Sequence, residues 1–340
     1  MTDRRQSFAL MDCTFRDGGF QTDWRFSDAM ARQYFGTCLA TGVDIVELGY
    51  LNLDPGATTS YTGSYKALPE SLTAQQRELI NPGAMKVTVM IDAGQIVGQS
   101  PQAAARLIVA AVRRTPFRID ILRIAAKSNE VQASLALAQA LAGHGLEVML
   151  NLMQIGELPA DELARILRRL DGEPLAALYF ADSFGRLLPD QVHRLFRQAA
   201  EMTALPLGFH AHDNYGLAVA NTHAALGAGA RFADGTFAGL GRGAGNAPTE
   251  TLALLKSEAH TMDACERFLA EHIEPLRAVA NWGYSPTYRC QARHNVHPTY
   301  AQKLFEGAPL TCLERNDIIG RIAGHVGSHK FDLNILNQYT

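Results

Sequence analysis

The stretch Leu205-Pro206-Leu207-Gly208-Phe209-His210-Ala211-His212 runs from a short apolar segment into a pair of histidines. The apolar half, interrupted by Pro206 and Gly208, is typical of the end of a buried strand. Side chains two positions apart on a strand point to the same face, so His210 and His212 can hold one metal ion between them. The alternative is that two histidines fall by chance near a strand end.

A second informative stretch, residues 13–19 (Cys-Thr-Phe-Arg-Asp-Gly-Gly), follows the apolar run Phe8–Met11 near the start of the chain. It offers a carboxylate at Asp17. One carboxylate and two imidazoles make a mixed nitrogen and oxygen site with open positions, which suits a hard or borderline divalent ion.

Outward from these stretches, short apolar runs alternate with segments of helical spacing. We predict eight strands, at Phe8–Asp12, Asp44–Leu48, Lys86–Asp92, Asp120–Ala125, Leu146–Leu152, Ala176–Asp182, Leu205–His212 and Arg231–Thr236. We predict helices at Asp28–Ala40, Gln102–Arg114, Glu130–Ala142, Ala160–Leu170, Asp190–Glu201, Leu217–Leu226 and Thr249–His260. Eight strand-then-helix units predict an α/β fold, a parallel TIM (β/α)8 barrel, over an open doubly wound sheet.

Polar residues end or follow several of these apolar runs, where barrel enzymes carry their active sites. They are Arg16, Asp17, Glu47, Asp92, Asn151, Asp182, His210 and His212. Because a buried strand does not tolerate an unpaired charge, each needs a partner or a metal ion. Taken alone, Asp92 is equally well explained as a helix cap.

Composition narrows the function classes. The chain has 340 residues, 47% of them hydrophobic, and a formal net charge of −3. No basic field points to nucleic acid or to a membrane surface, and no run approaches a membrane span. Residues 1–6 lack the apolar core of a signal peptide, and the five cysteines form no C-x-x-C pair. We therefore expect a cytoplasmic protein that binds neither nucleic acid nor membranes.

Several spaced motifs together resemble a known group of enzymes. They are Arg16-Asp17-Gly18, Glu47, Ala181-Asp182-Ser183-Phe184-Gly185, His210-Ala211-His212-Asp213-Asn214 and Gly241-Arg242-Gly243-Ala244-Gly245-Asn246. In this order they resemble the DRE-TIM metallolyases, the HMGL-like superfamily, and above all proteins similar to 4-hydroxy-2-oxovalerate aldolase.

The resemblance implies roles for individual residues. Asp17, His210 and His212 would bind a divalent metal, Mn²⁺ first, with Mg²⁺ or Co²⁺ as alternatives. Arg16 would hold an enolate oxyanion and Glu47 would orient Arg16. The list of expected substrate-binding residues is Asp182, Phe20 and Asn246, the last also a candidate fourth metal ligand.

The C-terminal part of the chain carries expectations for the domain division and for the general base. We predict a catalytic barrel over residues 1–262 and a helical extension over 263–340 that completes the active site or an oligomer interface. Within it, Tyr284 resembles a catalytic tyrosine of the oxovalerate aldolases, although a tyrosine that packs a helix is equally consistent. The general base stays open among a metal-bound water, Tyr284, His294 and His297.

One departure from the resemblance concerns the proton relay. The oxovalerate aldolases carry a basic histidine three residues after the aspartate ligand, where this chain has Phe20. We therefore expect a different relay and a different substrate.

The expected activity is a metal-dependent aldolase that forms or cleaves a 4-hydroxy-2-oxo acid through a pyruvate enolate. The alternatives are a Claisen-type acyltransferase that condenses acyl-CoA with a 2-oxo acid, and a non-catalytic barrel. Expected partners are pyruvate, an aldehyde, a second copy of the chain in a homodimer, and an aldehyde-processing enzyme.

Overall fold

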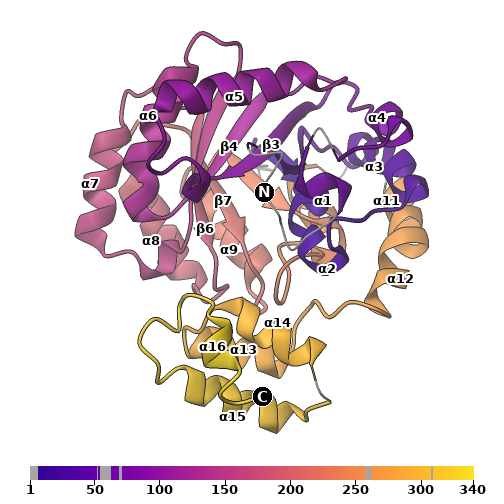
Figure 1. Ribbon diagram of the computed structural model, residues 1–340, viewed down its shortest axis with the longest axis vertical. Coiled ribbons are helices and arrows are strands. Elements are labelled where there is room, and N and C mark those ends of the chain that lie inside the picture. The colour runs from indigo at the N-terminus through magenta and orange to yellow at the C-terminus, as the bar shows by residue number, and fades with distance from the viewer. Residues whose placement is uncertain (1–6, 52, 54–62, 69–70, 258–261, 308) are drawn as a thin grey trace, which may run out of the picture.

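The computed structural model describes residues 7–51, 53, 63–68, 71–257, 262–307 and 309–340. Its eight strands form a closed parallel barrel in chain order, as predicted (Figure 1). They are β1 (Ala9–Asp12), β2 (Ile45–Tyr50), β3 (Lys86–Asp92), β4 (Ile121–Ala126), β5 (Glu147–Leu152), β6 (Ala177–Asp182), β7 (Leu207–Ala211) and β8 (Phe232–Gly235).

Most helices coat the outside of the barrel, whereas the first two are single turns in the loop after the first strand, and the first of these is fully buried (Figure 1). In chain order they are α1 (Thr14–Asp17), α2 (Gly19–Thr22), α3 (Asp28–Ala40), α4 (Ala74–Leu79), α5 (Pro101–Arg114), α6 (Val131–Leu141), α7 (Ala160–Leu170), α8 (Pro189–Ala200), α9 (Ala218–Gly227) and α10 (Thr249–Lys256). Ser27 caps α3, since its side chain accepts a hydrogen bond from the Met30 amide. Ser100 precedes α5 without making such a bond.

The strands follow a two-residue alternation that decides which side chains reach the barrel interior. In β5, Val148, Leu150 and Leu152 pack into the large core between strands and helices, whereas Met149 belongs to a separate small cluster inside the barrel. Asn151 shares the parity of Met149. Polar side chains of that parity therefore point inward.

Element ends differ from prediction in a few places. The seventh strand begins at Leu207, because Pro206 has no amide hydrogen to donate, and His212 follows it as an isolated bridge to Asn246. The second strand runs on to Tyr50 through a register shift. The helix predicted to end at His260 ends at Lys256, and residues 258–261 lie outside the described part.

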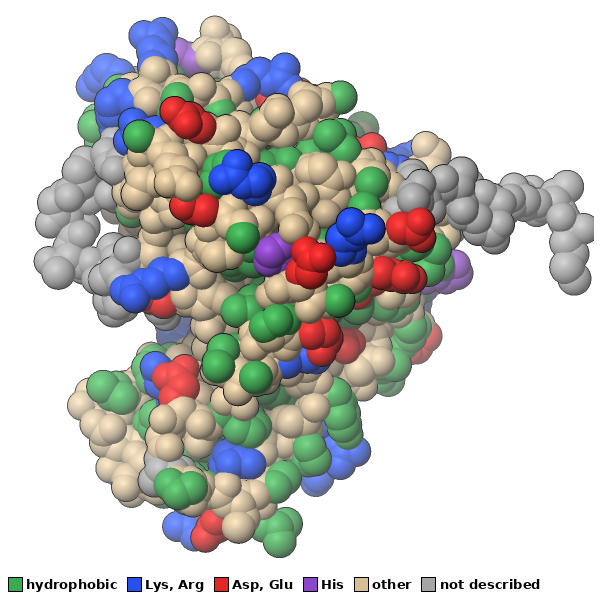
Figure 2. All heavy atoms as spheres, turned by 90° about the vertical axis from the view of Figure 1, so that its right-hand side faces the viewer, with side chains coloured by type: hydrophobic (Ala, Val, Ile, Leu, Met, Phe, Trp, Pro, Cys, Tyr) green, Lys and Arg blue, Asp and Glu red, His purple; other side chains and the backbone are tan. Residues whose placement is uncertain are grey.

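The C-terminal region is helical, as predicted. It contains α11 (Asp263–Phe268), α12 (Glu274–Arg277), α13 (Pro286–Arg293), α14 (Pro298–Glu306), α15 (Cys312–Ile322) and α16 (Leu333–Leu336). The barrel core extends through Trp282, and a second core of buried side chains runs from Tyr288 to Leu336. Helices α13 to α16 form a smaller lobe below the barrel, and Figure 2 shows mixed hydrophobic and charged side chains on this side. The division at residue 262 stays a prediction.

No helix in the described ranges is both long and apolar enough to cross a lipid bilayer.

Candidate active site

A cavity of about 100 Å³ lies at the carboxyl ends of the strands, where the sequence predicts the active site. Its lining side chains come from most of the barrel strands and the loops after them. They are Arg16, Asp17, Phe20, Tyr50, Met90, Asp92, Ala125, Asn151, Met153, Ala181, Ser183, His210, His212 and Arg242. Asp92 and Asn151 thus reach the cavity from two further strands.

Asp17, His210 and His212 are buried, and each offers a ligand atom within 4.8 Å of the other two. The Nδ1 atom of His210 lies 2.9 Å from Oδ2 of Asp234, and Nδ1 of His212 lies 3.2 Å from the carbonyl oxygen of Gly245. These contacts leave both Nε2 atoms for a ligand, and that of His210 is buried without a partner. The donor set therefore fits a divalent ion.

The electrostatics of this group also suit a metal site. Burial lowers the pKa of His212 to about 3, so the imidazole is neutral, as metal binding requires. Burial alone would raise the pKa of Asp17, but the guanidinium of Arg16 together with the neighbouring His212, His210 and Arg242 outweighs it and holds that pKa well below its usual range. Asp17 is therefore a carboxylate.

We call Asp17, His210 and His212 the metal-type group. A second set of side chains that could bind a metal ion, Cys13, His210 and Asp234, shares His210 with it. Its Asp234 carboxylate is already engaged, because Oδ2 contacts both Nη2 of Arg123 at 2.5 Å and the His210 ring. Burial also raises the pKa of the Cys13 thiol well above its usual range. This group is the poorer site for an ion.

Arg16 is held by two carboxylates. Its Nε donates to Oε2 of Glu47 at 2.6 Å, and its Nη1 donates to Oδ1 of Asp17 at 2.6 Å. The remaining nitrogen, Nη2, is buried without a partner. Glu47 and Asp17 thus fix two of the three guanidinium nitrogens, and the third stays available as a donor beside Asp17, His210 and His212.

The loop after Arg16 depends on a close approach. The Trp24 indole donates to the carbonyl oxygen of Arg16 at 2.9 Å, and a methyl group at Gly19 would overlap that indole ring. A glycine at this position therefore lets Trp24 support the backbone of the arginine.

A buried arginine that the sequence analysis did not single out lies inside the barrel. Arg123 of β4 contacts Glu47 at 3.4 Å through Nη1 and Asp234 at 2.5 Å through Nη2, and its guanidinium stacks 4.0 Å from the ring of Tyr179. Arg123 therefore links Glu47, which contacts Arg16, to Asp234, which contacts His210. The sequence feature that could have identified Arg123 is a charged residue in the middle of the apolar run 120–125.

The loop after β8 closes over Asp17. Asn246 donates from Nδ2 to Oδ2 of Asp17 at 2.5 Å, while its own Oδ1 is buried without a partner. A methyl group at Gly241 would lie 2.6 Å from Oδ2 of Asp17 and overlap the Asn246 amide. Asn246 is thus adjacent to the metal-type group without lining the cavity itself.

Phe20 lines the cavity as expected, and it stacks on a residue the sequence left unassigned. Its ring lies 5.5 Å from the guanidinium of Arg242 and 4.7 Å from the ring of Trp24. Its carbonyl oxygen accepts a hydrogen bond from Gln302 of α14, so the C-terminal lobe reaches this loop.

Two predicted site residues lie elsewhere. The Asp182 carboxylate accepts hydrogen bonds from the amides of Arg186 and Leu187, at 3.3 and 2.9 Å, and burial raises its pKa to about 6. It caps the turn after β6 instead of facing the cavity. Tyr284 is 57% exposed and does not line the cavity.

The two histidines considered as bases differ. His294 is exposed, whereas His297 caps α14 by accepting from the Thr299 amide through Nδ1. Burial and the nearby charges of Arg242 and Lys127 lower the pKa of His297 to about 3.

The sequence analysis overlooked Lys66, which lies over the ring of Tyr50 at 3.6 Å. Burial lowers its pKa to about 8. Lys86, the first residue of β3, pairs with Glu147 at the opposite end of the barrel.

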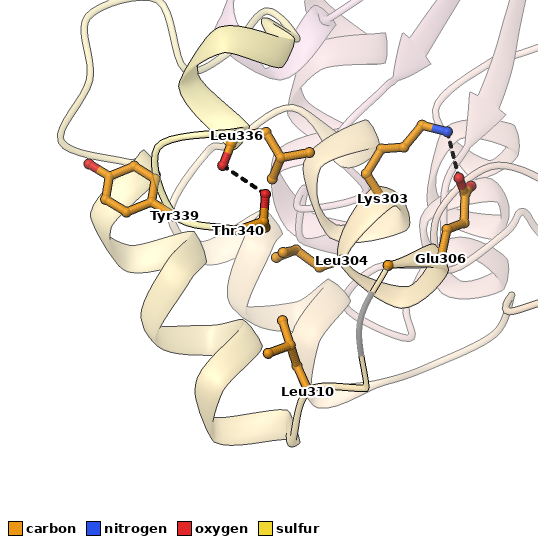
Figure 3. A pocket seen from close by; sticks show the side chains of 8 residues that line it. Lys303, Leu304, Glu306, Leu310, Leu336, Tyr339 and Thr340 are labelled. Atoms are coloured by element: carbon orange, nitrogen blue, oxygen red, sulfur yellow. Dashed lines mark hydrogen bonds and ion pairs between the residues drawn. The ribbon is translucent and has the colours of Figure 1, made fainter.

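A larger hollow, of about 380 Å³, lies in the C-terminal lobe and contains none of the predicted site residues. Figure 3 shows Leu304, Leu310 and Leu336 converging on it, with Lys303 paired to Glu306 at its rim. Its apolar lining offers no chemistry comparable to that of the smaller cavity.

Comparisons with known proteins agree with this geometry. The chain is 26% identical over 332 residues to an oxaloacetate decarboxylase of Mycobacterium tuberculosis, with 96% of this chain and 94% of that relative covered. It is 29% identical over 305 residues to a 4-hydroxy-2-oxovalerate aldolase of Thermomicrobium roseum, with 85% and 81% covered. The N-terminal domain of a Bacteroides vulgatus protein assigned as an aldolase matches with a TM-score of 0.74 and 26% identity, over 88% of this chain and 97% of that one. The HMGL-like family model matches residues 7–265, and the chain belongs to the HMGL-like family.

Proposed function

We propose that the chain is a metal-dependent carbon–carbon lyase, an aldolase that forms or cleaves a 4-hydroxy-2-oxo acid through the enolate of pyruvate. One observation carries the proposal: the buried ligand atoms of Asp17, His210 and His212 converge beside an arginine nitrogen that has no protein partner. The aldolase and decarboxylase names of the relatives support the same class.

The proposed roles follow from the contacts. Nη2 of Arg16 would donate to the oxygen that gains charge at C2 of the 2-oxo acid, while Glu47 and Asp17 fix the other guanidinium nitrogens. A divalent ion at Asp17, His210 and His212 (Mn²⁺ first, Mg²⁺ or Co²⁺ as alternatives) would supply Lewis acidity toward the 2-oxo acid. Arg16 then needs no movement to stabilise the developing charge.

In the cleavage direction, the C3–C4 bond breaks and C4 with its hydroxyl oxygen leaves as an aldehyde, while the hydroxyl proton passes to solvent water, which in net terms supplies the proton that C3 takes up. The electron pair passes to C2 and its oxygen as the enolate, which takes up a proton at C3 to become pyruvate. Arg16 would donate where this negative charge develops, and a divalent ion held by Asp17, His210 and His212 would add a second positive charge there.

A second candidate reaction is loss of CO₂ from a 2-oxo dicarboxylic acid, which gives the same enolate. Phe20 favours it, because this cleavage needs no base to take a hydroxyl proton and phenylalanine offers none.

The proposal is tested by loading the metal-free protein with Mn²⁺ and incubating it with pyruvate in D₂O. We expect one equivalent of bound metal and metal-dependent exchange of the methyl protons of pyruvate, followed by mass spectrometry. His210→Ala should lose both, whereas His193→Ala, a change on the exposed face of α8, should lose neither.

Stoichiometric metal without exchange would contradict the enolate chemistry. If such a preparation instead released free CoA from acetyl-CoA in the presence of 2-oxo acids, the acyltransferase alternative would replace the aldolase.

A further inference from the structure

Arg242 lines the cavity, and the proposed mechanism gives it no role. Its loop is fixed against the metal-type group, since the carbonyl oxygen of Gly245 accepts from the Asp213 amide at 2.9 Å and contacts His212. The carbonyl oxygen of Gly241 accepts from Gln21 at 2.9 Å. The guanidinium is therefore attached to a well-anchored support beside the site.

No carboxylate in the described part of the chain forms an ion pair with Arg242, and its Nε is buried without a hydrogen-bond partner. Arg16 and Arg123, by contrast, each contact two carboxylates. A guanidinium that is partly removed from water and left unpaired costs free energy. A ligand that pairs with it recovers that cost.

The surroundings of Arg242 hold it in place without neutralising it. The Phe20 ring lies 5.5 Å from the guanidinium, which leaves the in-plane N–H groups free to donate. Beyond burial, Arg242 and Lys127 both lower the pKa of His297, so two cations face that neutral ring.

The sum of charges at the site also favours a negatively charged ligand group at Arg242. The buried network has three carboxylates and two guanidiniums: Asp17, Glu47, Asp234, Arg16 and Arg123. A bound divalent ion and one substrate carboxylate bring this network to neutrality. At the rim, Lys66 and Asp92 offset each other, and the charge of Arg242 is then left over.

We propose that Arg242, supported by Phe20, binds a second carboxylate of the substrate, at the end remote from the 2-oxo acid group. The substrate class is then a 2-oxo dicarboxylic acid, and in the aldol direction the acceptor aldehyde carries a carboxylate. This inference rests on the proposed function, because the metal end of the site must hold the 2-oxo acid group.

The test compares two unreactive ligands of equal chain length, 2-oxoglutarate and 2-oxopentanoate, which differ in a terminal carboxylate against a methyl group. Calorimetry on the Mn²⁺-loaded protein should give at least about tenfold tighter binding of 2-oxoglutarate, the value of one charge-assisted contact. In Arg242→Gln the two affinities should become equal, while Mn²⁺ binding, measured separately by its electron spin resonance signal, persists.

Arg289→Gln is the matched control, because it removes one positive charge from an exposed position of α13. It should keep the preference of the wild type. Equal affinities in the wild-type protein, or the same loss of preference in Arg289→Gln, would overturn the proposed role of Arg242 but leave the proposed function standing. A protein that binds no Mn²⁺ would overturn the proposed function and this inference with it.

Discussion

Nδ1 of His210 lies 2.9 Å from Oδ2 of Asp234, and the same oxygen lies 2.5 Å from Nη2 of Arg123. The carboxylate thus fixes the histidine ring and is itself fixed by the arginine that also reaches Glu47. Because Glu47 orients Arg16, one chain of contacts inside the barrel positions both the proposed metal ligand and the proposed oxyanion donor.

The Asp234 carboxylate should strengthen metal binding from outside the ligand group. Asp234→Asn keeps an acceptor for the His210 N–H but removes the charge, so Mn²⁺ affinity should fall by about tenfold to a hundredfold. Titration by electron spin resonance measures it. Asp190→Asn, which removes an exposed carboxylate paired with Arg194, is the control and should leave the affinity unchanged. Equal affinities in the two variants would remove the support role of Asp234.

Arg16→Lys should bind metal normally and lose turnover. A lysine ammonium cannot contact Glu47 and Asp17 as a planar fork and still present a third donor to the substrate. Loss of one fixed oxyanion donor costs on the order of a hundredfold in rate. The rate of pyruvate proton exchange at saturating Mn²⁺ tests this. A variant within about threefold of the wild type would make Arg16 structural.

Gly241→Ala should weaken metal binding without unfolding the barrel. The new methyl would lie 2.6 Å from Oδ2 of Asp17, so the ligand carboxylate and the Asn246 amide must move apart. We expect Mn²⁺ affinity to fall by about tenfold or more, since ligand positions tolerate little displacement. Gly36→Ala on α3, where the methyl meets open space, should keep the affinity and gain about 0.5–1 kcal/mol of stability. Unchanged affinity in Gly241→Ala would count against Asp17 as a ligand.

His297 should make stability depend on pH in the acid range. Its folded pKa of about 3 lies below the ordinary value of 6.5, so the unfolded chain binds the extra proton between these values. The free energy of unfolding therefore falls as pH drops from about 6.5 toward 3. His297→Asn keeps a capping acceptor for the Thr299 amide but does not titrate, so the fall should be shallower.

Urea unfolding of metal-free protein at several pH values measures this slope. Wild type and variant share every other titratable group, so the difference between the two slopes isolates His297. His193→Asn, at an exposed position of α8, should keep the wild-type slope. A slope for His297→Asn as steep as that of the wild type would show that His297 is protonated in the folded state.

The sequence predicts the barrel because every strand is a short apolar run, and the same runs end in the polar residues that line the cavity. It places Asp182 wrongly because a strand end alone does not say which face a residue takes. Asp182 pairs in register with Ala211, while Ala181 pairs with His210, so the parity of β7 already turns Asp182 outward.

Arg123 and Asp234 were missed for a different reason. Each lies inside an apolar run, and its partner is on a strand far away in sequence. Nothing within either run shows that the other charge stands opposite it across a closed barrel. Arg242 was missed because a glycine-rich loop has no periodicity that would give the direction of its side chain.

Phe20 separates this chain from the oxovalerate aldolases that it resembles. Cleavage of 4-hydroxy-2-oxovalerate needs a group that accepts the proton of the 4-hydroxyl, and the phenylalanine ring that lines the cavity cannot accept one. In the proposed mechanism, formation of the pyruvate enolate depends instead on Arg16 and on the candidate metal ligands Asp17, His210 and His212, which are all present. We therefore expect proton exchange into pyruvate to persist while 4-hydroxy-2-oxovalerate is cleaved weakly or not at all. Both rates are measured on one Mn²⁺-loaded preparation, by isotope incorporation and by pyruvate release. Rapid cleavage of this small substrate would show that the proton leaves by another path and would return the chain to the ordinary aldolase branch.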